Sequence, residues 1–427
     1  MKKRIAFHTL GCKLNFSETS TIARMFPKSE YELVDFKEEA DFYVINSCSV
    51  TGIAEKKCKT AAKQAKKRNP KAMITMMGCF SQIKPETVAR FEAVDLVLGN
   101  EDKFNLPQYL INPEGERATE VHVIDLAKSK VFSPAYSSND RTRSFLKVQD
   151  GCDHFCTYCS IPFARGRSRS GNVDETIAKA EEIGRSNIRE IILTGVNIGD
   201  FGKGTDENFH DLLVKLEQVQ GIERIRISSV EPELLTDEII ELVAKSKIFL
   251  PHFHLPLQSG CDKTLKDMKR FYDTKLFAGR VKKIKELLPN ACIAADVIVG
   301  FPTEDEDDFA KTKQFIAELP ISYIHVFTYS QRENTKALKM KNVVTPPEKK
   351  KRSQVLHELS ERKRLQFYRE NIGTTHKVLF ESQDADGMIS GWTANYIKVR
   401  TTYRQNLENR IIGVILEEMG NDGVFVV

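Results

Sequence analysis

The chain has 427 residues, enough for two or three domains with separate hydrophobic cores. Its 64 basic and 59 acidic side chains leave a formal net charge of +5, which is too small to establish a polyanionic partner. No apolar run is long enough to span a bilayer and residues 1–9 do not form a secretory signal, so we expect a cytoplasmic protein that does not bind membranes. Nine cysteines in such a protein favour metal ligation or burial over disulfides.

The first part of the chain contains three short apolar runs, each of which ends just before a cysteine. Each run is typical of a buried strand, and helix-like stretches separate the runs, so the strands should be parallel with right-handed crossovers. Parallel strands bring their carboxyl ends to one edge of a sheet, where open α/β sheets hold their ligands. We therefore expect the cysteines to converge on an iron–sulfur cluster; three separately buried thiols are the alternative. The runs are residues 5–9, 41–46 and 73–77, and the cysteines are Cys12, Cys48 and Cys79.

A second group of cysteines is close together in the sequence. Cys152, Cys156 and Cys159 follow a strand-like run at 145–148 with the spacing Cys-x3-Cys-x2-Cys. Three thiolates can hold a four-iron cluster with one iron left without a protein ligand, and an open metal position is where chemistry takes place. The alternatives are buried thiols or a structural zinc site, which would need a fourth Cys or His nearby. The three remaining cysteines are expected to be core or surface thiols: Cys58, Cys261 and Cys292.

From residue 145 onward, apolar strand-like runs alternate with helical patterns. Six such strands predict a parallel sheet that curls into a partial (β/α)6 barrel. Active sites of these barrels lie where the strands end, although turn formation alone is the alternative for each residue found there. The runs are 145–149, 190–194, 224–229, 252–257, 292–299 and 323–329. The strand-end candidates are Thr194, Gly195, Asn197, Glu231 and Asp296.

Three arginines follow the second cysteine group by a few residues. Arg165, Arg167 and Arg169 should border its pocket, whereas other basic runs of the chain have the solvated helix face as their usual explanation.

The end of the chain has a different pattern. Thr345, Pro346 and Pro347 interrupt the preceding pattern, and residues 348–370 are typical of a charged amphipathic helix. About five short apolar runs follow, which predict a small β-barrel, a fold that often binds oligonucleotides through aromatic and basic side chains. Lys398 and Arg400 are basic candidates there, while the nearby aromatic side chains fit a core equally well.

Taken together, these parts resemble the radical S-adenosylmethionine (SAM) methylthiotransferase family over essentially the whole chain. Residues 9–15, Thr-Leu-Gly-Cys-Lys-Leu-Asn, are similar to its amino-terminal motif, Cys-x3-Cys-x2-Cys is similar to its SAM-cleaving motif, and the end resembles its RNA-binding TRAM domain. The resemblance implies an α/β protein with an N-terminal open parallel sheet, a central radical SAM barrel and a small C-terminal β-barrel. The implied parts are an auxiliary-cluster domain at 1–125, a linker at 126–143, the radical SAM domain at 144–345, a linker helix at 346–371 and the TRAM domain at 372–427.

The resemblance also implies two [4Fe–4S] clusters. The cluster that cleaves SAM would be held by Cys152, Cys156 and Cys159, and the auxiliary cluster, which carries the transferred sulfur, by Cys12, Cys48 and Cys79. The implied SAM-binding residues are Thr194, Gly195, Asn197, Glu231, Asp296 and Tyr158, and the implied substrate contacts are Arg165, Arg167, Arg169, Lys398 and Arg400.

Within the family, the motifs at 149–152, 229–232 and 255–260 look most like the branch that acts on threonylcarbamoyladenosine. The implied reaction converts N6-threonylcarbamoyladenosine next to the tRNA anticodon into its 2-methylthio derivative, with one SAM as methyl donor and another as radical source. The expected partners are the tRNA anticodon stem-loop and an electron donor such as flavodoxin or ferredoxin, and we expect a monomer. The alternatives are a methylthiotransferase for isopentenyladenosine tRNA or for a ribosomal-protein aspartate, and a non-catalytic iron–sulfur RNA-binding protein.

Overall fold

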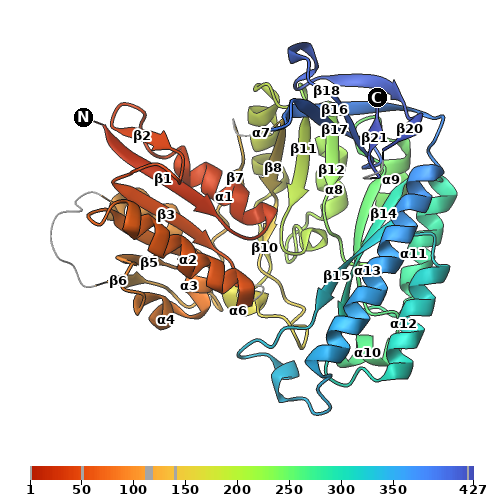
Figure 1. The fold of residues 1–427 in the computed structure, drawn as a ribbon, viewed down its shortest axis with the longest axis horizontal. Coiled ribbons are helices and arrows are strands. Elements are labelled where there is room, and N and C mark those ends of the chain that lie inside the picture. Colours follow the sequence, from red (N-terminus) through yellow and green to blue (C-terminus); the bar gives the residue numbers. More distant parts are fainter. Residues whose placement is uncertain (1, 50–51, 111–118, 139–141, 421–422) are drawn as a thin grey trace.

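The computed structural model describes residues 2–49, 52–110, 119–138, 142–420 and 423–427. Its three parts follow one another along the chain: an N-terminal α/β part, a central barrel-like part and a C-terminal β part (Figure 1).

The N-terminal part is built on a parallel sheet with strand order β2-β1-β3-β4-β5-β6. Thr9 pairs with Asn46, and Ser47 pairs with Gly78, so the carboxyl ends of β1, β3 and β4 lie side by side at the same level. The strands are β1 (Lys3–Thr9), β2 (Tyr31–Val34), β3 (Phe42–Ser47), β4 (Met73–Gly78), β5 (Leu96–Leu98) and β6 (Glu120–His122).

Alternating side chains of these strands form two separate cores, one on each face of the sheet. Ala61 of α2 packs on the face that Tyr43 and Ile45 share, and Ile22 of α1 packs on the opposite face beside Phe42. The helical elements are α1 (Lys13–Ala23), α2 (Gly52–Arg68), α3 (Cys79–Ile83), α4 (Pro85–Ala89), η1 (Asp102–Asn105) and α5 (Leu106–Tyr109).

The central part contains the six parallel strands that the sequence predicts. β8, β11 and β12 form one sheet with β7, while β13, β14 and β15 form another. Isolated bridges from Ile225 to Phe249 and from Ser229 to His254 join the two sheets at β12 and β13. These strands are β8 (Arg143–Lys147), β11 (Glu190–Thr194), β12 (Arg224–Ile227), β13 (His252–Gln258), β14 (Cys292–Val299) and β15 (Tyr323–Thr328).

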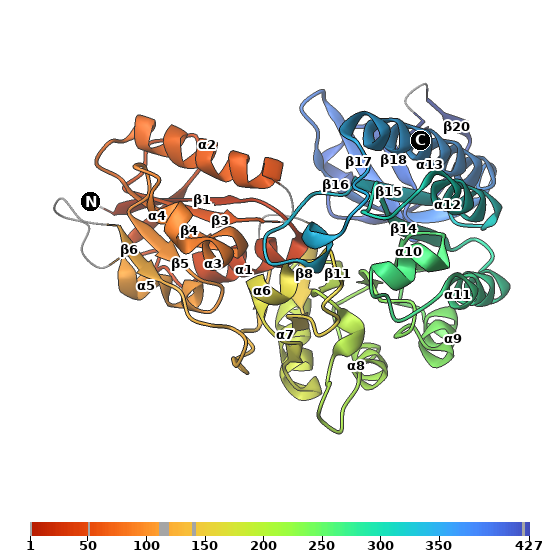
Figure 2. The ribbon, with the colours of Figure 1, turned by 90° about the horizontal axis from the view of Figure 1, so that it is seen from below.

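Helices follow one another along the outer side of these strands, and the N-terminal part packs at the β8 end (Figure 2). There α1 contacts β7 and β8, and α3 contacts α6. The strand β7 (Ala135–Tyr136) lies inside the segment expected to be a linker, of which residues 139–141 are outside the described residues. The remaining elements are β9 (Gln149–Asp150), α6 (Ile161–Arg165), β10 (Arg169–Ser170), α7 (Val173–Gly184), η2 (Ile198–Asp200), α8 (Phe209–Leu216), α9 (Asp237–Lys245), α10 (Asp262–Asp267), α11 (Thr274–Leu287), α12 (Glu306–Glu318) and η3 (Lys336–Lys339).

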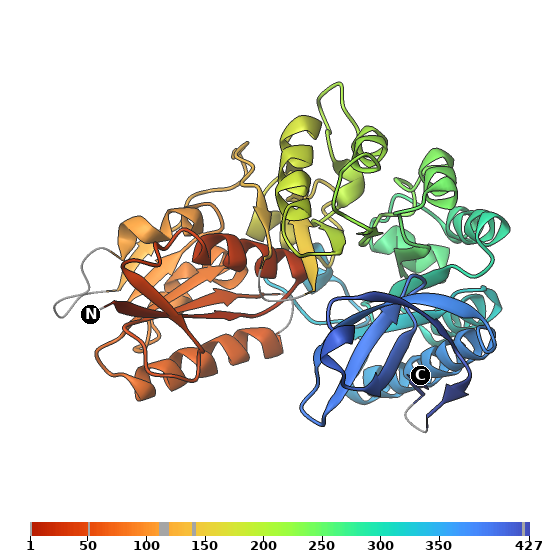
Figure 3. The ribbon, with the colours of Figure 1, turned by 90° about the horizontal axis from the view of Figure 1, so that it is seen from above.

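The C-terminal part begins with the predicted long helix, α13 (Pro346–Arg369), which packs along β14 and β15. A curled sheet of order β19-β16-β17-β18-β21-β20 follows and encloses its own small core (Figure 3), with one strand more than the sequence indicated. None of the described helices has the length and apolar character required to cross a membrane. The elements are β16 (Thr375–Gln383), β17 (Met388–Thr393), β18 (Lys398–Thr402), η4 (Gln405–Leu407), β19 (Ile411–Ile415), β20 (Glu418–Met419) and β21 (Phe425–Val426).

Candidate cluster and substrate site

The Cys-x3-Cys-x2-Cys segment forms a tight loop between β9 and α6. The backbone N–H of Cys152 donates to the Gly166 carbonyl at 3.1 Å, and that of Cys159 donates to the Cys156 carbonyl at 3.0 Å. Burial raises the pKa of Cys152 to about 12, and the neighbouring Cys159 and Cys156 thiols also raise it. Burial likewise raises the pKa of Cys159 to about 12. Three such thiols side by side become thiolates when a metal displaces their protons, so the loop fits a cluster.

Arg270 connects this loop to the end of β12. Its Nη1 donates to the Cys156 Sγ at 2.9 Å and to the Tyr158 hydroxyl at 3.4 Å, and its Nη2 pairs with the Glu231 carboxylate. Burial raises the pKa of Glu231 to about 7 in spite of that cation. The structure thus brings Tyr158 and Glu231, both predicted for SAM, to the loop through an arginine that no sequence pattern indicates.

The end of β11 provides the next predicted residues. Thr194 is buried, and its carbonyl accepts from the Val148 N–H at 2.9 Å. A Cβ on Gly195 would lie 2.9 Å from the Gln149 carbonyl oxygen, so only glycine permits this close approach. The Gln149 Oε1 in turn accepts from the Asn197 N–H at 2.8 Å, which fixes the turn beside the cysteine loop.

Several buried polar atoms beside the loop have no hydrogen-bond partner within the described residues. They are the Nδ1 of His154, the Oδ1 of Asn197 and both carboxylate oxygens of Glu233. Asn197 Nδ2 lies 3.5 Å from His154 Nε2, and Glu231 lies in the same group of residues. Buried polar atoms normally find partners, so this group fits a polar ligand such as SAM. His154 and Glu233 were not among the predicted site residues.

Asp296 lies farther along the barrel. Its Oδ1 is 2.9 Å from the Nε2 of His254, and its charge also acts on Glu231. Its direct partner is thus a histidine on β13, and it groups with His254 and His325 and not with Glu231.

The three strand-end cysteines lie near one another. Cys12 precedes α1, Cys48 follows β3 and Cys79 begins α3. A Cβ on Gly11, which has φ +109°, would lie 3.1 Å from the Cys48 Sγ, so the turn before Cys12 rests directly on Cys48. Cys12 and Cys79 are close enough for their charges to interact. Three thiols from three adjacent strand ends fit a second cluster.

The two cysteine groups share a polar link. Asn100 Nδ2 lies 3.6 Å from the Cys79 Sγ and donates to the Ala164 carbonyl at 2.7 Å. Ala164 belongs to α6, which begins two residues after Cys159. The remaining cysteines are all buried, as core thiols would be: Cys58, Cys261 and Cys292.

Arg165 is in the interior, contrary to the prediction that it contacts a substrate. It is 1% exposed, and its guanidinium pairs with Glu18 at 3.0 Å and with Asp150 at 3.0 Å. Lys103 and Lys147 pair with the same Glu18 at 2.6 and 2.9 Å. Burial acts to raise the pKa of Glu18, but these three cations hold it well below its ordinary value. Arg165 therefore joins α1, α6 and β9 and leaves no surface for a phosphate.

The other predicted substrate contacts differ in exposure. The Arg167 side chain is 58% exposed and stacks over the Phe155 ring at 4.8 Å. Arg169 has an 11% exposed side chain that donates to the Val131 carbonyl at 2.6 Å. Lys398 and Arg400 lie on β18 in the C-terminal sheet, where Arg400 pairs with Asp386, so the structure does not gather the five predicted contacts at one place.

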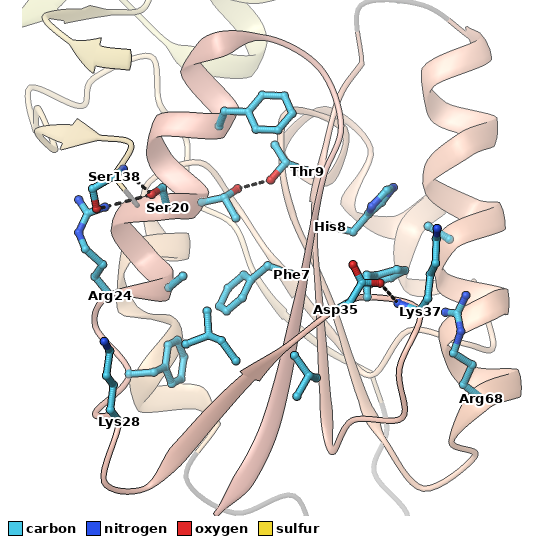
Figure 4. A pocket seen from close by; sticks show the side chains of 18 of the residues that line it. Phe7, His8, Thr9, Ser20, Arg24, Lys28, Asp35, Lys37, Arg68 and Ser138 are labelled. Carbon is cyan, nitrogen blue, oxygen red and sulfur yellow. Dashed lines mark hydrogen bonds between the residues drawn. The ribbon is translucent and has the colours of Figure 1, made fainter. Parts of the chain in front are cut away.

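A cavity of about 1120 Å³ opens in the N-terminal part, between α1 and α2 beside β1 (Figure 4). Its lining combines aromatic side chains such as Phe7 with cations such as Lys28 and Lys37. None of the predicted site residues lines it, so it is separate from both cysteine groups.

Comparisons with known proteins give two family matches and a shared fold. Residues 4–99 match the family described as "Uncharacterized protein family UPF0004", and residues 146–316 match the radical SAM superfamily. Membership in that superfamily implies a [4Fe–4S] cluster and SAM. A solved structure of the radical SAM methyltransferase TsrM from Kitasatospora setae shares the fold, with a TM-score of 0.56 at 12% identity over 79% of this chain and 77% of that chain.

Curated relatives extend the match to nearly the full length. Threonylcarbamoyladenosine tRNA methylthiotransferase MtaB of Bacillus subtilis is 38% identical over 99% of this chain and 96% of its own length. The protein of the same name from Aquifex aeolicus is 37% identical over 93% and 96%. The tRNA-2-methylthio-N(6)-dimethylallyladenosine synthase of Endomicrobium trichonymphae is 31% identical over 98% of each chain. With both cysteine groups placed and full-length relatives of this kind, the chain belongs to the radical SAM methylthiotransferase family.

Proposed function

We propose that the protein converts N6-threonylcarbamoyladenosine next to the tRNA anticodon into its 2-methylthio derivative. The observation that carries the proposal is the proximity of two cysteine triads, which are linked through Asn100 between Cys79 and α6. The relatives named for threonylcarbamoyladenosine support the choice of substrate, since they match at up to 38% identity.

In this proposal the loop cysteines 152, 156 and 159 hold the SAM-cleaving cluster, and Cys12, Cys48 and Cys79 hold an auxiliary cluster. When bound, the first supplies the electron for reductive cleavage of SAM, and the second supplies the sulfur that is methylated and transferred. The C2–H of adenine has no useful acidity near neutral pH, so acid–base groups alone would not achieve the substitution.

The protein's own groups then bind and orient the reactants. Arg270 donates to Cys156 and holds Glu231 toward the loop. Asn197, Glu233 and His154 offer unpartnered polar atoms to the amino, carboxyl and ribose groups of SAM. Thr194, Gly195 and Asp296 complete the proposed SAM site.

The RNA must present the target base outside its stack, because the C2 atom is otherwise enclosed by neighbouring bases. Exposed Arg167 and the basic residues of β18, Lys398 and Arg400, are proposed phosphate contacts. The proposal includes the domain limits given above, a TRAM-type role for the C-terminal sheet, action as a cytoplasmic monomer, and a flavodoxin or ferredoxin as electron donor.

Mass spectrometry of tRNA nucleosides from a strain that lacks the gene tests the proposal. We expect loss of 2-methylthio-N6-threonylcarbamoyladenosine and accumulation of the unthiolated nucleoside, with rescue by wild type and by Cys58→Ala but not by Cys12→Ala. Loss of the 2-methylthio derivative of dimethylallyladenosine instead would assign the other substrate, for which the relatives at 31–32% identity are named. An unchanged profile in a strain with no second enzyme of this kind would contradict a tRNA substrate.

A further inference from the structure

A group of basic side chains lies where the three parts of the chain meet. We call Lys13, Arg226 and His252 the junction cluster. Lys13 begins α1 directly after Cys12, Arg226 lies on β12 and His252 begins β13. The Arg226 guanidinium lies 4.7 Å from the ring of Tyr396, and the His252 ring lies 4.6 Å from the same ring. Tyr396 belongs to the C-terminal part, so all three parts of the chain contribute to the surroundings of the cluster.

The three members are electrostatic neighbours. The charge of Arg226 acts on Lys13, and the charges of both Arg226 and Lys13 act on His252. The cations Lys13 and Arg226 thus act on each other, and like charges in a buried place are unfavourable unless an anion offsets them.

The cluster has buried nitrogen atoms without partners. Arg226 is 1% exposed and His252 is 7% exposed, yet the Nη2 of Arg226 and both ring nitrogens of His252 have no hydrogen-bond partner in the part of the chain that the structure describes. Lys13 is half-buried and makes no hydrogen bond or ion pair with the described residues. Buried groups of this kind normally have partners, so these atoms fit a ligand with acceptor atoms.

Carboxylates of the protein satisfy the cluster only in part, through Glu190, whose charge also acts on Lys13. Glu190 pairs with Arg226 Nε at 3.1 Å, and Arg143 pairs with Glu381 at 2.7 Å. These two arginines therefore have acidic partners, whereas Lys13 has none among the residues that the structure places. The ligand that fits the cluster is therefore an anion, because the Lys13 ammonium group and the unpaired Arg226 guanidinium N–H both donate.

The position of the cluster connects it to the proposed reaction centre. Lys13 is covalently next to Cys12. His252 and His254 are two residues apart on β13 and share one face of the strand, and His254 pairs with Asp296, whose charge acts on Glu231 of the SAM site. An adenine bound beside Cys12 would lie next to Lys13, the member of the junction cluster that adjoins Cys12 in the chain.

We infer that the junction cluster binds the carboxylate of the threonylcarbamoyl group on the target adenosine, with Lys13 as its direct cationic ligand. The inference rests on the proposed function and deepens it. A threonylcarbamoyl group ends in a carboxylate, whereas a dimethylallyl group is entirely apolar and would leave Lys13 and the buried donors unpaired. The cluster thereby selects the charged substrate and rejects the apolar one.

The test compares three anticodon stem-loop RNAs, which carry N6-threonylcarbamoyladenosine, its neutral carboxamide analogue or dimethylallyladenosine. Dissociation constants are measured by fluorescence anisotropy, and kcat/KM by product formation, for wild type, Lys13→Gln and Lys245→Gln. Lys245 is exposed at the end of α9, so its variant is a charge-matched control. We expect wild type and Lys245→Gln to prefer the acid by about tenfold to a hundredfold, the range for a charged hydrogen bond, and Lys13→Gln to lose most of this preference.

Each outcome has a distinct meaning. Equal use of acid and amide by a wild-type enzyme that is active on both overturns the inference and leaves the proposed function intact. A wild-type preference that Lys13→Gln retains overturns the assignment to Lys13. Activity on dimethylallyladenosine RNA with none on threonylcarbamoyladenosine RNA instead refutes the proposed function. Since the wild-type comparison needs no variant, the result does not depend on how Lys13→Gln folds or loads iron.

Discussion

Arg165 and Arg167 are two residues apart in a basic run, yet the structure gives them opposite roles. Arg165 is buried with Glu18 and Asp150, so Arg165→Gln leaves two carboxylates in the interior without their principal cation. Removing one partner of a buried ion pair lowers the free energy of unfolding by about 3–5 kcal/mol. Because Lys103 and Lys147 still pair with Glu18, we expect a loss nearer the lower limit. Arg167→Gln removes an exposed side chain, so the free energy of unfolding should change by no more than about 0.5 kcal/mol.

Urea denaturation followed by circular dichroism measures the first effect, and RNA binding at several salt concentrations measures the second. We expect Arg165→Gln to lower the midpoint of unfolding strongly and to leave the salt dependence of RNA binding unchanged in the fraction that remains folded. Arg167→Gln should unfold like wild type and bind RNA more weakly. Because it loses one phosphate contact, the slope of log affinity against log salt should become about one unit less steep. An Arg165→Gln protein with wild-type stability and weakened RNA binding would refute this reasoning.

Three further predictions concern the cysteines, a glycine and a histidine. Cys79→Ala should lower the iron content of the reconstituted protein by about one cluster, whereas the nearby buried Cys58→Ala should not, as iron analysis will show. Gly151→Ala should destabilise the protein by more than about 1 kcal/mol in urea denaturation, because φ is +70° there and the new Cβ would meet the Arg167 carbonyl. Burial and the charges of Arg226, His254, Lys13 and His325 hold the pKa of His252 well below 6.5, so the unfolded state binds more protons and stability falls as the pH drops below 6.5. His252→Gln should reduce the loss of unfolding free energy below pH 6.5 by up to about 1.4 kcal/mol per pH unit. The same pH dependence in wild type and His252→Gln would argue against the lowered pKa of His252.

The framework of the fold is predictable from the sequence because its strands are buried on both faces. Runs such as 42–47 and 73–78 are buried throughout and mostly apolar, and the parallel connection rule then places Cys48 and Cys79 at one edge. Strands β2 and β6 were not predicted. They are short, largely exposed edge strands, so few of their side chains need to be apolar.

Contacts between distant segments account for most of what the sequence did not reveal. In the sequence nothing distinguishes Arg165 from a surface arginine, because its partner Glu18 is 147 residues away. Arg270 reaches Cys156 across 114 residues and belongs to no motif. The junction cluster joins residues from two parts of the chain and packs against Tyr396 of the third, so neither periodicity nor spacing indicates it.

The most direct test of the central claim is a stoichiometric assay with purified protein, reconstituted with iron and sulfide under anaerobic conditions, and tRNA that carries N6-threonylcarbamoyladenosine. The account predicts 2-methylthio product together with one 5′-deoxyadenosine and one S-adenosylhomocysteine for each product formed. It also predicts that Cys79→Ala still cleaves SAM but forms no product. Thiomethylation by Cys79→Ala at the wild-type rate, or a wild-type protein that holds its clusters and does not cleave SAM under reduction, would contradict it.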